Sequence, residues 1–285
     1  MASLPPPNQP PRALDPALLA QLERVAVTVA REAASLVLQQ RPARLDPRAK
    51  TSATDVVTVM DTRSEEAIRR RLRELRPEDA LLGEEGGASI GSTGITWVVD
   101  PIDGTTNYLY DLPLYAVSVA AAVGSPPALG WRPVAGAVVA AAWDVCWSAH
   151  LGGGARRQGP GGVPVAAVHV GGGSELGQAL VATGFGYRPE RRAVQAQVLT
   201  RVLPQVRDIR RLGSAAVDLC LVADGRMDAY FETGLNPWDL AAGWLVVTEA
   251  GGVVLGPDEP GENEAKLTVA GNPVLAALLG DLLAH

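Results

Sequence analysis

The segment from Trp97 to Tyr108, WVVDPIDGTTNY, constrains the fold and chemistry of this chain more than any other stretch. Its first three residues are apolar, as is typical of a short buried strand, and they lead directly into two acids, Asp100 and Asp103. Pro101 fixes one φ angle and has no N–H to donate, so we expect the backbone to leave the sheet there. The segment therefore predicts a buried strand that ends in a group of oxygen ligands.

Such a group of oxygens suits a hard cation. Mg²⁺ is usually bound by one or two carboxylates together with substrate phosphate and water. Asp100, Asp103 and the carbonyl of Ile102 supply suitable oxygens, and the N–H groups of Gly104 and Thr105 could hold a phosphate oxygen beside the metal. The alternative is an Asp-rich turn that caps a helix, because most Asp-Gly pairs are used in that way.

Two further blocks accompany this segment in the chain. Gly83-Glu84-Glu85 lies upstream, and Asn236-Pro237-Trp238-Asp239 lies downstream. Together the three blocks resemble the signature of the inositol monophosphatase family, which consists of Mg²⁺-dependent phosphatases of small phosphorylated polyols and nucleotides. The resemblance extends from about Lys50 to the C-terminus, and Lys50 itself matches a basic residue at the entrance of the family's site.

The resemblance implies a role for residues in each block. Thr105 would orient the attacking water, Asp61 would hydrogen-bond that threonine, and Glu84 would help to deprotonate the water. Local sequence alone would assign Asp61 to a helix cap and Asp239 to the first turn of a helix, where the helix dipole favours an acid. Two or three Mg²⁺ ions would be held by Glu84, Asp100, the Ile102 carbonyl, Asp103 and Asp239.

The same resemblance implies which residues contact the substrate. They are Asp103, Gly104, Thr105, Gly213, Ser214, Ala215, Glu232 and Asp239. From the residues alone, Ser214 is equally well explained as the N-cap of a helix, and Glu232 as a solvated acid at the end of a strand. We expect hydrolysis of myo-inositol 1-phosphate; the alternatives are fructose 1,6-bisphosphate, histidinol phosphate or phosphoadenosine phosphate as substrate, and a role in binding the transcription machinery.

Composition limits the partners and the location of the protein. The chain has 285 residues and a net charge of −6, which argues against a nucleic-acid-binding face. It has neither a charge-free apolar run of about 18 residues nor an N-terminal signal pattern, so we expect a cytoplasmic protein that spans no membrane. Cys146 and Cys220 are isolated in apolar surroundings, which predicts buried free thiols. The resemblance further implies a homodimer and sensitivity to Li⁺.

Apolar periodicity and turn residues predict the elements. A long amphipathic helix is expected from Pro16 to about Gln40, and Thr62 with Glu65 predicts a capping box at the start of the next helix. Val/Ala-rich runs after Tyr115 indicate an antiparallel sheet, whereas strands alternate with helices after Val163. We therefore expect an α/β protein, and the resemblance implies a layered α-β-α-β-α sandwich. The expected parts are a disordered lead (1–13), an antiparallel-sheet subdomain that carries the metal motifs (14–162) and an α/β subdomain (163–285).

Overall fold

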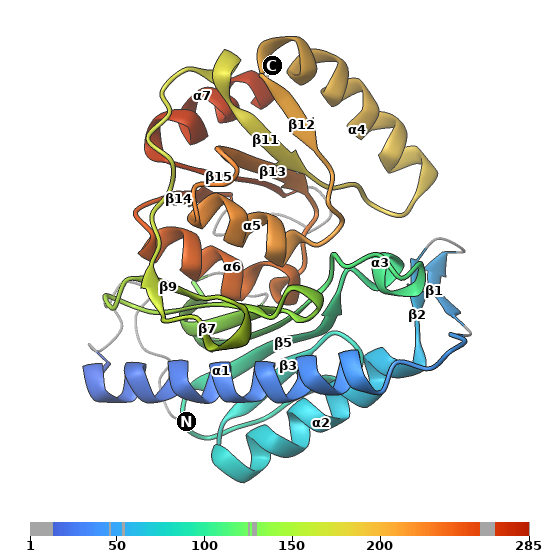
Figure 1. Cartoon of the computed structure of the whole chain (residues 1–285), viewed down its shortest axis with the longest axis vertical. Coiled ribbons are helices and arrows are strands. Elements are labelled where there is room, and N and C mark those ends of the chain that lie inside the picture. The colour runs from blue at the N-terminus through green and yellow to red at the C-terminus, as the bar shows by residue number, and fades with distance from the viewer. Residues whose placement is uncertain are drawn as a thin grey trace, which may run out of the picture.

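A computed structural model describes residues 14–45, 47–52, 55–124, 126, 130–256 and 266–284 of the chain. Figure 1 shows five layers in the order helices, sheet, helices, sheet, helices. Helices α1 (Pro16–Gln39) and α2 (Val59–Leu75) form one outer layer, and α4 (Pro189–Val202) and α7 (Pro273–Ala284) form the other. The expected α-β-α-β-α sandwich is thus confirmed. The expected lead of residues 1–13 lies outside the described residues.

The first outer layer consists of α1 (Pro16–Gln39) and α2 (Val59–Leu75). The helical spacing predicted for α1 is confirmed, and its apolar face packs against strands β6 and β7 of the larger sheet. The predicted start of α2 is wrong. Its capping box is formed by Thr58 and Asp61 rather than by Thr62 and Glu65, because the carboxylate of Glu65 accepts hydrogen bonds from a different segment, residues 85–86.

The larger sheet has eight strands in the order β10-β9-β8-β7-β6-β5-β3-β4. Its neighbouring strands run antiparallel, except that β3 is parallel to β5. The strands are β3 (Ala80–Gly83), β4 (Gly87–Ser89), β5 (Ile95–Asp103), β6 (Ala116–Val123), β7 (Arg132–Ala140), β8 (Val145–His150), β9 (Ala155–Gln158) and β10 (Ala166–Ala167). Outside this sheet lie a two-stranded hairpin, β1 (Arg48–Ser52) with β2 (Asp55–Val57), and the short helix α3 (Thr105–Leu109).

The smaller sheet has five strands in the order β12-β11-β13-β15-β14. The pairs that β11 makes with β12 and β13 are parallel, and the pairs that β15 makes with β13 and β14 are antiparallel. Its strands are β11 (Leu180–Thr183), β12 (Asp208–Arg210), β13 (Ala229–Thr233), β14 (Val253–Leu255) and β15 (Leu267–Gly271). Helices α4 (Pro189–Val202) and α7 (Pro273–Ala284) lie on its outer side (Figure 1).

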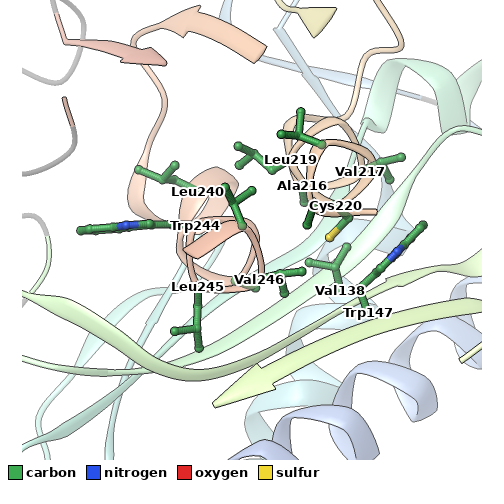
Figure 2. Close-up of a cluster of buried hydrophobic side chains, with 14 of the residues drawn as sticks. Val138, Trp147, Ala216, Val217, Leu219, Cys220, Leu240, Trp244, Leu245 and Val246 are labelled. Atoms are coloured by element: carbon green, nitrogen blue, oxygen red, sulfur yellow. The ribbon is translucent and has the colours of Figure 1, made fainter. Parts of the chain in front are cut away.

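Helices α5 (Ala215–Ala223) and α6 (Pro237–Glu249) fill the layer between the two sheets. Figure 2 shows their apolar side chains meeting Val138 of β7 and Trp147 of β8. The two helices touch closely, because a β-carbon added at Gly243 would lie 2.7 Å from Cδ1 of Leu219. This shared core fixes the positions of the N-terminal ends of both helices relative to each other.

Two further observations concern the described part of the chain. Cys146 and Cys220 are buried free thiols, as predicted. None of the helices that the structure describes has the length and apolar character needed to cross a membrane.

Candidate active site

A cavity of about 580 Å³ lies beside the ends of β3 and β5 and the first turns of α5 and α6. Elements from both halves of the chain therefore contribute to one site. All of the predicted site residues except Asp61 line it: Glu84, Asp100, Ile102, Asp103, Gly104, Thr105, Gly213, Ser214, Ala215, Glu232 and Asp239.

Strand register brings the acids of the first two motifs together. Gly83 of β3 is paired in parallel with Val99 of β5, so the next residues, Glu84 and Asp100, leave the two strands side by side. Strand β5 does not end at Pro101 as we expected. It continues to Asp103 through a bulge. The bulge accommodates Pro101, which has no N–H to donate, and pairing with β6 resumes at Asp103.

Three carboxylates converge in the cavity. One oxygen each from Asp100, Asp103 and Asp239 lies within 4.8 Å of the others. Asp239 comes from the first turn of α6, where Pro237 occupies the predicted first position and the carboxylate accepts a 2.8 Å hydrogen bond from the N–H of Asn236. The helix start thus orients this acid toward the two acids of β5.

The carboxylates of this cluster repel one another, as is typical of a cation site. Burial raises the pKa of Asp100 well above its usual range, and the nearby Glu84, Asp103 and Asp239 raise it further. The pKa of Asp239 is raised in the same way, by burial first and then by Asp103 and Glu84. A hard divalent cation would remove this repulsion, and the donors are all oxygens, so these residues fit the expected Mg²⁺.

Asp103 accepts hydrogen bonds from the start of helix α5. Its Oδ2 accepts hydrogen bonds of 2.7 Å from both Ser214 Oγ and the N–H of Ala216. Burial raises the pKa of Asp103 to about 6, although these hydrogen bonds act in the opposite direction. Ser214 is also the N-cap of α5, since its Oγ accepts a hydrogen bond from the N–H of Val217. The capping interpretation and a place in the site are therefore compatible.

Thr105 and Asp61 form a buried pair behind the cluster. Thr105 Oγ1 lies 2.9 Å from Asp61 Oδ1 and 3.1 Å from the Ile102 carbonyl oxygen. The other carboxylate oxygen of Asp61 accepts hydrogen bonds from the N–H and hydroxyl of Thr58, at 2.8 and 2.5 Å. Asp61 thus caps α2 and contacts Thr105 at the same time.

Glu232 lies at the end of β13 on the far side of the cavity, and it is not the solvated acid that local sequence suggests. Its Oε2 accepts a 2.6 Å hydrogen bond from the hydroxyl of Tyr230. Burial raises the pKa of Glu232 to about 7, opposed by that hydrogen bond. A β-carbon at Gly184 would overlap this carboxylate, so any larger residue where the chain leaves β11 would displace Glu232 from its present position.

Sequence reasoning missed a group of residues on the same side of the cavity. Arg188, Arg191 and Arg211 line it, as does Asp218. Arg191 donates a 2.6 Å hydrogen bond to the carbonyl of Thr233. The available signal was the glycine-rich turn at 184–186, which directly follows a strand and marks a loop that can border a site in an α/β sheet. The side chain of Lys50 lies outside what the structure describes.

Comparisons with known proteins agree with this geometry. A sequence model of the inositol monophosphatase family matches residues 18–284. The inositol-1-monophosphatase SuhB of Mycobacterium tuberculosis is 46% identical over 251 residues, covering 83% of this chain and 84% of the relative. The Nus factor SuhB of Salmonella typhimurium is 34% identical over 268 residues, covering 90% and 94%. The solved structure of M. tuberculosis SuhB has a TM-score of 0.78 at 43% identity, covering 93% of this chain and 96% of that one. The chain belongs to the inositol monophosphatase family of phosphatases.

Proposed function

We propose that this protein hydrolyses a phosphate monoester of a small polyol, preferentially myo-inositol 1-phosphate, in a Mg²⁺-dependent reaction without a covalent intermediate. The observation that carries the proposal is the convergence of three carboxylates, that of Asp100 fully buried, beside the Thr105–Asp61 pair in one cavity. The choice of substrate is supported by the name of the M. tuberculosis relative, inositol-1-monophosphatase SuhB.

The metal would be held by oxygens that the chain already brings together. Its ligands would be Glu84, Asp100, the Ile102 carbonyl, Asp103 and Asp239, with two or three Mg²⁺ ions per site. When bound, Mg²⁺ would supply positive charge that neutralises a dianionic phosphate and stabilises both the attacking oxygen and the leaving alkoxide.

The chain's own residues would orient the attacking water. The Thr105 hydroxyl has one proton, and at 2.9 Å from Asp61 that proton can be donated to the carboxylate. The hydroxyl oxygen then accepts from the water, which leaves a lone pair of the water directed at phosphorus. Glu84, half-buried beside Asp100, would accept the proton that the water loses.

The same cavity would bind the polyol. We assign Gly213, Ser214, Ala215 and Glu232 to its hydroxyl groups, because these residues line the cavity and match the positions that the family uses for substrate hydroxyls. Gly104 and Thr105 would contact the phosphate through their N–H groups. A homodimer, inhibition by Li⁺ and a cytoplasmic location are further proposals that rest on the family resemblance.

The test is phosphate release from a panel of monoesters with Mg²⁺ titrated. The panel contains myo-inositol 1-phosphate, fructose 1,6-bisphosphate, phosphoadenosine phosphate and histidinol phosphate, and Asp103→Asn is the control variant. We expect Mg²⁺-dependent turnover with a preference for the inositol ester and a loss of on the order of 100-fold or more in the variant. Efficient turnover of another ester alone would contradict the substrate assignment but leave the metal chemistry in place.

A second candidate function is a role with the transcription machinery, because the Salmonella relative is named a Nus factor. It can be separated from catalysis in a deletion strain of a bacterium that carries this chain. If Asp103→Asn rescues growth of the strain, the binding role is favoured. If the wild type rescues growth and the variant does not, although both proteins are folded, the enzymatic role is favoured.

A further inference from the structure

We propose that Glu65 is a positioning residue for Glu84: its carboxylate holds the turn between β3 and β4 and thereby fixes the metal ligand that begins this turn. The inference rests on the proposed function, since it takes Glu84 to be a metal ligand. Glu65 does not line the cavity. It would therefore act through the backbone rather than by touching metal or substrate.

The contacts of Glu65 are directed at the residues that follow Glu84. The side chain comes from α2 and is only 2% exposed. Its Oε2 accepts a 2.7 Å hydrogen bond from the N–H of Glu85, and its Oε1 accepts one of 2.7 Å from the N–H of Gly86. Hydrogen bonds to an ionised acceptor are roughly twice as strong as those between neutral groups. One buried carboxylate thus binds two consecutive N–H groups of the turn.

Arg69 completes the clamp from the next turn of α2. Its Nε lies 2.7 Å from Glu65 Oε1, and its Nη2 donates a 2.5 Å hydrogen bond to the carbonyl of Gly87. The guanidinium compensates the buried negative charge, which would otherwise be costly to desolvate. It also binds the far end of the same turn. The Glu65–Arg69 pair therefore contacts the backbone at three successive residues after Glu84.

The two glycines of the turn leave room for this carboxylate. A β-carbon at Gly83 would overlap the carboxylate of Glu65. At Gly86 it would lie 2.7 Å from Oε1 of Glu65 and 2.8 Å from Nε of Arg69. Since φ of Gly86 is not in the left-handed region, a substitution there would act through the close approach of the Glu65 carboxylate and the Arg69 guanidinium, which would have to shift, and not through backbone strain.

Glu84 is consequently restrained on both sides. On its N-terminal side, Gly83 is paired with Val99 in the sheet. On its C-terminal side, the backbone is bound to Glu65. Without Glu65 the turn would lose two hydrogen bonds that help to define where the ligand points. Residues that orient a metal ligand in this way typically change metal affinity or activity by about 10 to 100-fold when they are replaced.

The first experiment measures Mg²⁺ binding to metal-free protein by isothermal titration calorimetry, for the wild type, Glu65→Gln and Glu66→Gln. Glutamine keeps one acceptor but replaces the other with an NH₂ group, which cannot accept from the turn, and it removes the negative charge that pairs with Arg69. We expect about tenfold or greater weakening of Mg²⁺ binding for Glu65→Gln, with a comparable loss of kcat and little change in KM. Glu66 is the exposed neighbour on the same helix, so Glu66→Gln makes the same charge change and should match the wild type.

The second variant, Gly86→Ala, separates positioning from charge. The added methyl group would push the turn away from Glu65 without altering any carboxylate, so Mg²⁺ binding should weaken as in Glu65→Gln. Gly172→Ala, where nothing lies within 4 Å of the added carbon, is the matched control. Unchanged Mg²⁺ affinity in folded Gly86→Ala or Glu65→Gln would overturn the inference. Because binding is measured directly, the inference can stand even if no monoester is hydrolysed, an outcome that would contradict only the proposed function.

Discussion

Thr105 illustrates, at the scale of a single residue, how a buried hydroxyl can serve both stability and chemistry. We predict that Thr105→Val lowers kcat by on the order of 100-fold, because the variant lacks the hydroxyl that we propose to orient the water. It should also lower the free energy of unfolding by about 1 to 3 kcal/mol, since Asp61 Oδ1 loses its 2.9 Å donor in a buried position. Phosphate release and urea denaturation measure the two effects.

Thr105→Ser is the matched control, because serine keeps the hydroxyl and removes only a methyl group. We expect it to retain most of the activity and most of the hydrogen bond to Asp61. Similar losses of kcat in both variants would show that packing of the methyl group, rather than the hydroxyl, determines the rate.

The residues of the site that could be predicted are those whose neighbours are fixed by local sequence. Asp100 and Asp103 share one strand with its bulge, and Asp239 lies in a helix start marked by Asn-Pro. Glu65 could not be recognised, because its partners are 20 and 21 positions away and its T-x-x-E spacing is also that of a capping box. Arg191 of α4 was missed for the same reason, since its partner Thr233 lies 42 positions away in β13.

At the scale of elements, the packing of α5 on α6 determines where Ser214 and Asp239 are placed. We predict that Gly243→Ala lowers the free energy of unfolding by about 1 to 3 kcal/mol, although alanine is ordinarily the better helix former. The added β-carbon would lie 2.7 Å from Cδ1 and 2.8 Å from Cβ of Leu219, and the latter atom cannot move without shifting α5. Thermal or urea unfolding checks the sign.

Gly280→Ala in α7 provides the comparison, because its added carbon meets only Cδ1 of Leu255, at 4.0 Å. There we expect the usual helix preference to prevail and stability to rise by up to about 1 kcal/mol. A gain at both positions would contradict the close contact between α5 and α6.

The elements themselves were largely predictable where the local signal is strong: the apolar period predicts α1, and the Asn-Pro start predicts α6. Errors arose where two local rules competed. Thr58-x-x-Asp61 and Thr62-x-x-Glu65 both have the spacing of a capping box, and only the tertiary contacts of Glu65 decide between them. Pro101 suggested the end of a strand, but pairing with β6 on both sides of the bulge keeps β5 in the sheet.

At the scale of the whole molecule, the acid cluster forms only when the two halves of the chain meet. Asp100 and Asp103 come from the larger sheet, and Asp239 comes from the helix layer that the smaller sheet covers. The apolar core around α5 and α6 therefore has to hold together several buried or half-buried carboxylates that repel one another in the absence of a cation. Folding and Mg²⁺ binding should consequently be coupled, and pH should change both.

We predict that the stability of metal-free protein falls as pH rises from about 4 to about 6. The pKa of Asp103 is about 6 in the folded chain, above its ordinary value of 3.8. The folded state therefore holds this proton more tightly than the unfolded state does. The resulting stability is fully present below about pH 4 and is lost as pH rises through about 6. Asp100 and Asp239 have pKa values raised in the same direction and extend the effect to higher pH.

Mg²⁺ should reverse this loss, because binding requires the ionised carboxylates and releases their protons. Saturation to about 100 times the dissociation constant adds about 2.7 kcal/mol. The increase in Tm caused by Mg²⁺ should therefore be larger near pH 8 than near pH 5.5, as differential scanning calorimetry with and without chelator can measure. In Asp103→Asn one titrating group is removed, so both the pH dependence and the Mg²⁺ effect should shrink. An equal increase in Tm at both pH values would show that the carboxylates are already ionised in the metal-free fold. The two halves of the chain would then be stable enough to keep these charges together without a cation.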